Sequence, residues 1–156
     1  MDEKVALSIR LELFWWVFTL VVAFGVLYPI LRTVSHYPFL LTNLVYIFVF
    51  ITFTRYVFLL QHTFLAHKQV LKAIVIALSI PLIFYLISEL NFFQTYLDEQ
   101  GLEGFMGDIP YENRASIGSF IRNEMMLFGV GSIIIAIIFP FRMLLSLWRW
   151  KNRGTV

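Results

Sequence analysis

The 156-residue chain contains no cysteine, which removes several kinds of chemistry at once. Disulfide bonds, thiolate metal sites, cysteine nucleophiles and c-type haem attachment all require a sulfur that this sequence does not supply. The sequence also lacks a glycine-rich phosphate loop, a His-Glu-x-x-His zinc motif and a Gly-x-Ser-x-Gly nucleophile motif. It therefore favours a non-catalytic role and predicts no bound cofactor or metal.

Charged residues are also scarce, at 14% of the chain, whereas an ordinary soluble domain has about 25%. Hydrophobic residues make up 60%, more than a soluble chain of this length could cover with polar groups. The basic residues gather near the ends of apolar segments, which indicates orientation in a membrane and argues against nucleic-acid binding. The composition predicts a polytopic membrane protein that is surrounded by the lipid bilayer.

Apolar stretches long enough to cross a bilayer occur along the whole chain, and a helix is the form in which they satisfy their backbone without water. They cover residues 13–30, 39–60, 73–90 and 125–147. The predicted fold is therefore an all-α membrane protein with four transmembrane helices in a single domain, residues 1–156. One sizeable acidic loop is expected at residues 91–114, between the third and fourth helices.

The distribution of lysine and arginine predicts the orientation of these helices. With both termini in the cytoplasm, only Arg32, Arg114 and Arg122 of the 12 basic residues lie on the outer side. The positive-inside rule favours this arrangement. The chain is thus predicted to lie in a bacterial inner membrane with its acidic loop outside, the bacterial origin being suggested by a cysteine-free composition rich in phenylalanine and isoleucine.

The last apolar stretch has a longer polar lead-in than a membrane span needs. A helix from Ala115 to Trp148 would extend roughly 50 Å, against a hydrocarbon core of about 30 Å. The lead-in, residues 115–124, either continues the helix beyond the membrane or lies along the interface. One face of this helix predicts close packing, within the bundle or against a partner. Its residues are Gly118, Arg122, Gly129, Ser132 and Ala136.

Three charged residues, Glu12, Arg55 and Arg142, are predicted at a similar depth near the inner face of the membrane. A charge in hydrocarbon costs several kcal/mol unless it is paired or reaches the headgroups. Each arginine could extend to the headgroups alone, or Glu12 could pair with one or both arginines. The two arginines could also bind the phosphate of a lipid.

A second polar group is predicted at the outer mouth of the helix bundle. It comprises His36, Glu89, Asn91 and Glu124, with Arg32 and Arg122 beside them. Carboxylate, imidazole and guanidinium groups together are the parts of an acid–base or ligand site. The alternative is that headgroups and water satisfy each of these helix-end side chains separately.

The leading functional hypothesis is a small, non-catalytic integral subunit or assembly factor of a larger membrane complex. It would dock through its last helix and outer loop, so its partner is predicted to be another membrane protein or a second copy of the chain. One alternative is a homo-oligomeric channel or transporter lined by Arg55, Glu89 and Arg122. Another is a small lipid-acting membrane enzyme that uses His36, Glu89 and Glu124.

Overall fold

The computed structural model describes residues 3–107 and 109–152, and these residues form long helices joined by short connections. The helices are α1 (Glu3–Thr33), α2 (Leu40–Leu59), α3 (Gln69–Gln100) and α4 (Tyr111–Asn152). Short 3-10 turns lie in the connections, η1 (Leu60–His62) and η2 (Phe64–His67) before α3, and η3 (Leu102–Phe105) after it. Each of the four helices is long and apolar enough to span a membrane, which confirms the all-helical prediction with its four candidate spans.

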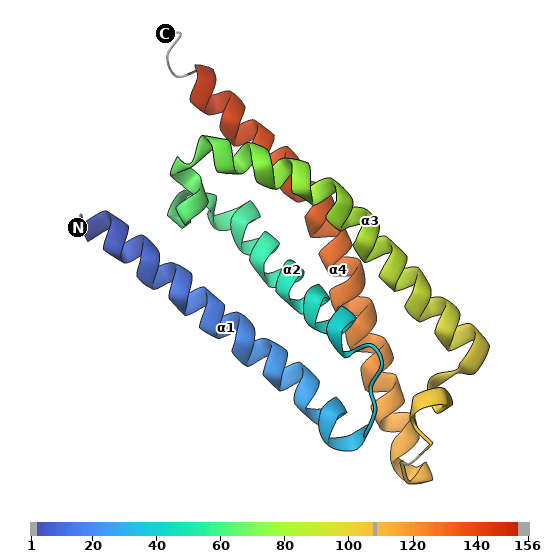
Figure 1. The fold of residues 1–156 in the computed structure, drawn as a ribbon. Helices are drawn as coiled ribbons and strands as arrows, with labels where there is room; N and C mark the ends of the chain where they lie inside the picture. Colours follow the sequence, from blue (N-terminus) through green and yellow to red (C-terminus); the bar gives the residue numbers. More distant parts are fainter. Residues whose placement is uncertain (1–2, 108, 153–156) are drawn as a thin grey trace.

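Successive helices run in opposite directions, so the connections alternate between two ends of the molecule (Figure 1). The end with the first turn of α1, the α2–α3 connection and the last turn of α4 is named the terminal end. The opposite end, with the α1–α2 and α3–α4 connections, is named the hairpin end. Helices α2 and α4 form the most extensive pair, with α3 packed on α4 and α1 packed along α2.

Helix α4 runs unbroken for 42 residues, with Pro140 inside it. At 1.5 Å per residue it is roughly 63 Å long, about twice the thickness of the hydrocarbon core. Residues 115–124 therefore continue the helix and do not form a separate interfacial segment.

The prediction of a loop at residues 91–114 is wrong at both ends of that range, because α3 continues to Gln100 and α4 already begins at Tyr111. The expectation ended the third helix where its apolar run ended. In the structure the polar residues beyond that point share helical turns with Phe93, which is fully buried. The helix ends at Gly101, whose φ of 64° is a left-handed conformation that glycine adopts without steric cost.

The core lies mainly in the half of the molecule nearer the hairpin end, where α2, α3 and α4 meet. Tyr46, Leu86, Ile121 and Met125 are fully buried there. A smaller apolar cluster at the terminal end includes Phe139, whose ring stacks on a phenylalanine of α2. Large apolar side chains on the outward faces of all four helices remain exposed, as a lipid environment allows.

Candidate functional site

The small-residue face of α4 packs inside the chain. Gly118, Gly129, Ser132 and Ala136 are all buried. A Cβ atom at Gly129 would lie 3.0 Å from Leu90 Cδ1 and 3.3 Å from Tyr46 Cε2, so α2 and α3 both approach this point. The face therefore mediates packing within the bundle and is not available to a partner, because the neighbouring helices already fill it.

Arg122 was expected to point either into the bundle or toward a partner, and it does not point into the bundle. Its side chain is exposed and lines a cavity of about 380 Å³ between α3 and α4. This cavity is named the α3–α4 groove, and its walls are Gln94, Leu97, Asp98, Leu102, Arg122 and Met126. It combines charges of both signs with apolar side chains.

Arg55 and Glu12 form an ion pair between α2 and α1, with 2.7 Å between the Arg55 Nη2 and Glu12 Oε1 atoms. The Arg55 side chain is 5% exposed and the Glu12 side chain 17% exposed. The guanidinium also lies 5.8 Å from the centroid of the Trp15 ring and 5.5 Å from that of Tyr56. Arg142 is not part of the ion pair described here and donates from Nε to the Val57 carbonyl oxygen at 3.0 Å.

Replacing Glu12 with glutamine is expected to lower the free energy of unfolding by about 1 kcal/mol, because Arg55 then keeps its buried charge with only a neutral acceptor beside it. Equilibrium unfolding of the purified chain in mixed detergent micelles measures this change. Replacing the exposed Glu99 with glutamine is the matched control and should change the stability by less than about 0.5 kcal/mol. Equal effects of the two changes would show that the ion pair adds nothing to stability.

Two of the residues predicted at the outer mouth are joined to α2. Glu89 on α3 accepts a 2.6 Å hydrogen bond from Thr42 Oγ1. Glu124 on α4, which is 6% exposed, accepts a hydrogen bond from Asn43 Nδ2. Asn43 is fully buried and also donates to the Tyr37 hydroxyl oxygen at 3.3 Å.

This Asn43–Glu124 pair was not foreseen from the sequence, although a lone asparagine in an apolar span is a signal that could have indicated it. Glu124 Oε2 and Asn43 Oδ1 are buried with no hydrogen-bond partner among the described residues. Tyr37 lies in the α1–α2 connection, where burial and then the nearby Glu124 raise the pKa of its phenol.

The other two residues predicted at this mouth, His36 and Asn91, are exposed. His36 lines a separate surface cavity beside Tyr96 and Phe105. The structure thus divides the predicted acid–base constellation into the buried Glu124 and the half-buried Glu89, which both accept hydrogen bonds from α2, and two surface side chains. The residues expected to line a transport route are similarly dispersed: Arg55 pairs with Glu12, Glu89 with Thr42, and Arg122 lines the groove.

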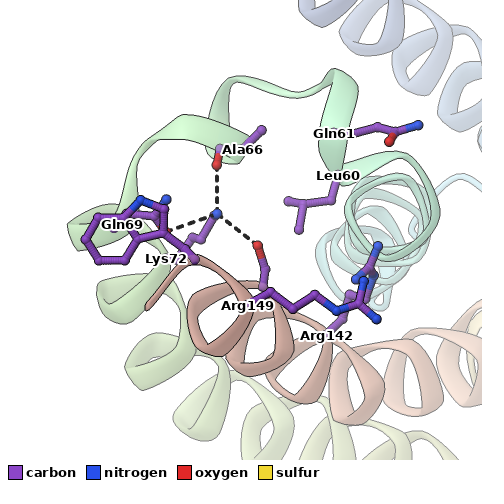
Figure 2. Close-up of a pocket in the computed structure, with 9 residues that line it drawn as sticks. Leu60, Gln61, Ala66, Gln69, Lys72, Arg142 and Arg149 are labelled. Atoms are coloured by element: carbon purple, nitrogen blue, oxygen red, sulfur yellow. Dashed lines mark hydrogen bonds between the residues drawn. The ribbon is translucent and has the colours of Figure 1, made fainter. Parts of the chain in front are cut away.

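A second cavity, of about 410 Å³, lies at the terminal end between the α2–α3 connection and α4. It is named the cationic cavity, and the described residues that line it are Leu60, Gln61, Ala66, Gln69, Lys72, Arg142, Ser146, Arg149 and Trp150. Figure 2 shows Lys72 between the connection and α4, where Arg142 and Arg149 lie. Lys72 is only 2% exposed. The sequence analysis considered Arg142 together with Arg55 as a phosphate site, whereas the cavity brings Arg142 together with Lys72 and Arg149, and Lys72 comes from a segment far away in the chain.

The described residues contain no group of three or more histidine or acidic side chains that could hold a metal ion. Comparison of the chain with protein-family models, curated proteins and solved structures gave no match to any of them. The side chains and cavities described above are therefore the basis on which its function is inferred.

Proposed function

We propose that the protein is a non-catalytic integral membrane subunit or assembly factor that docks on another membrane protein through the α3–α4 groove. The observation that carries this proposal is an exposed groove, lined by polar and apolar side chains, between the two longest helices of the chain. Helix α3 has 32 residues and α4 has 42, or roughly 48 and 63 Å, so both exceed a hydrocarbon core of about 30 Å.

The excess length supports a docking element at the hairpin end. Phe39, the residue before α2, packs against Phe93 and Tyr96 of α3, with ring centroids 5.0 and 5.1 Å apart. The α3 residues that follow Tyr96 therefore lie beyond the first turn of α2. The α3–α4 connection packs on α3 through Phe105, whose ring centroid lies 5.9 Å from that of Tyr96, and on α4 through Met106, which lies against Gly118. Met106 and Ile109 are buried, so the described part of the connection is folded against the helices.

The composition of the groove supports a protein partner. Leu97, Leu102 and Met126 supply an apolar surface, while Arg122 and Asp98 supply opposite charges beside it. Protein interfaces combine an apolar centre with a polar rim, and arginine is enriched among the residues that dominate their binding energy. The small-residue face, in contrast, is already filled by the chain itself.

The proposed orientation places both termini in the cytoplasm of a bacterial cell and the hairpin end outside the inner membrane. The distribution of basic residues supports it, since nine of the 12 would then lie on the cytoplasmic side. The groove would then meet the extracytoplasmic part of its partner.

Reversing the charge of Arg122 with glutamate is expected to reduce partner capture by about tenfold, which corresponds to about 1.4 kcal/mol of binding free energy. A photoreactive amino acid at Gln94 cross-links the partner in intact cells, and mass spectrometry identifies it. The matched control is Arg32→Glu, which makes the same change at an exposed arginine outside the groove. It should leave the cross-link unchanged.

The outcome also separates two kinds of partner. A cross-linked dimer of the chain would identify a second copy as the partner, and a cross-link to another membrane protein would identify a larger complex. If Gln94 cross-links nothing but lipid, or if Arg122→Glu and Arg32→Glu act equally, the groove is not a docking site.

A further inference from the structure

We propose that the cationic cavity at the terminal end binds a phosphate group, carried either by an anionic lipid or by a soluble phosphate. This site lies at the opposite end of the molecule from the α3–α4 groove. It does not depend on the docking proposal, and either of the two can fail alone.

The charge of Lys72 is the first reason to expect an anion. Its Nζ atom donates to the Ala66 carbonyl at 2.7 Å, to Ser146 Oγ at 3.0 Å and to Gln69 Oε1 at 3.2 Å. All three acceptors are neutral, so they fix the ammonium group in place and leave its positive charge uncompensated. None of the described residues that line the cavity is acidic. A buried charge without a counter-ion costs free energy, and a bound anion would offset that cost.

The two arginines supply hydrogen-bond donors that the anion could use. Arg142 and Arg149 are seven residues apart on α4, which places them on the same face of the helix. Arg142 is oriented by its Nε bond to the Val57 carbonyl oxygen, and its terminal nitrogens make no hydrogen bond or ion pair to another described residue. Arg149 has no hydrogen-bond or ion-pair partner among the described residues either and is exposed. The planar fork of a guanidinium matches the oxygens of a phosphate.

The depth of the cavity points to the membrane surface. Trp150 lines it, and tryptophan is enriched at the boundary between hydrocarbon and water. Basic pockets between transmembrane helices at this level bind the headgroups of anionic lipids. A volume of about 410 Å³ lies within the range of about 300–1,000 Å³ that is usual for small-ligand sites.

The test measures lipid binding to the full chain, purified and delipidated in a neutral detergent, by native mass spectrometry. The chain is titrated with phosphatidic acid and with phosphatidylcholine, each with and without excess inorganic phosphate. Since Lys72 is buried and its replacement can unfold the chain, the variant is Arg149→Gln, at an exposed position. The control is Lys151→Gln, which removes one exposed charge at the same end from a residue that does not line the cavity.

Phosphatidic acid is expected to bind about tenfold more tightly than phosphatidylcholine. Arg149→Gln should lower the affinity for phosphatidic acid about tenfold, whereas Lys151→Gln should change that affinity by less than about twofold. If inorganic phosphate leaves the lipid in place, the ligand is a lipid headgroup. If inorganic phosphate displaces the lipid and binds more weakly to Arg149→Gln, the site accepts a soluble phosphate. Equal binding of the two lipids, or equal effects of Arg149→Gln and Lys151→Gln, would overturn the proposal.

Discussion

Replacing Gly129 with leucine is expected to lower the free energy of unfolding by about 3 kcal/mol, the upper part of the range for overpacking a tightly filled core. A Cβ atom at this position already meets Leu90 at 3.0 Å and the Tyr46 ring at 3.3 Å, which come from α3 and α2. The larger side chain would therefore separate α4 from both neighbours. Equilibrium unfolding in mixed detergent micelles, followed by circular dichroism, measures the change.

Two further substitutions make this expectation specific. Gly129→Ala adds only the Cβ atom, so the neighbours need to move by a few tenths of an ångström and the loss should be about 1 kcal/mol. Gly25→Leu is the matched control, because a Cβ atom at Gly25 meets nothing within 4 Å, and no loss of stability is expected there. If Gly129→Leu left the chain stable but released a co-purifying protein, this face would serve a partner after all.

Replacing Asn43 with leucine is expected to lower the free energy of unfolding by about 2 kcal/mol. The substitution leaves the buried Glu124 carboxyl without its donor and removes a hydrogen bond to Tyr37 as well. Losing one partner of a buried polar pair costs about 1–3 kcal/mol, and hydrogen bonds within membranes contribute up to about 2 kcal/mol.

A double-mutant cycle isolates the Asn43–Glu124 interaction from the general effect of adding apolar surface. Glu124→Leu alone leaves the Asn43 amide with only its 3.3 Å bond to the Tyr37 hydroxyl oxygen, whereas the double variant Asn43→Leu, Glu124→Leu removes both members of the pair. The double variant should therefore be more stable than the sum of the single effects predicts, by at least about 1 kcal/mol. Additive effects would mean that the two side chains do not depend on each other.

The positions where sequence-based expectation and structure differ share a physical cause. Hydropathy reports whether a residue tolerates lipid, so it located the four spans but ended the third helix at Leu90, where apolarity ends and α3 does not. Helical periodicity grouped Gly118, Gly129, Ser132 and Ala136 on one face, and all four are buried, yet periodicity cannot say which helix covers that face. The same periodicity placed Arg122 beside these residues. In the structure its side chain is exposed and lines the α3–α4 groove.

The amino-acid sequence by itself determined that this chain forms four helices long and apolar enough to cross a membrane, because each apolar run is about as long as the hydrocarbon core is thick and a helix satisfies its backbone polar groups without water. It also identified Glu12 and Arg55 as candidates for an ion pair, since both charges lie near the end of an apolar run. The tertiary structure alone decided that Asn43 meets Glu124 and that Lys72 gathers with Arg142 and Arg149. Those contacts depend on how one helix is rotated and shifted along its axis relative to another, and the local sequence does not determine either quantity.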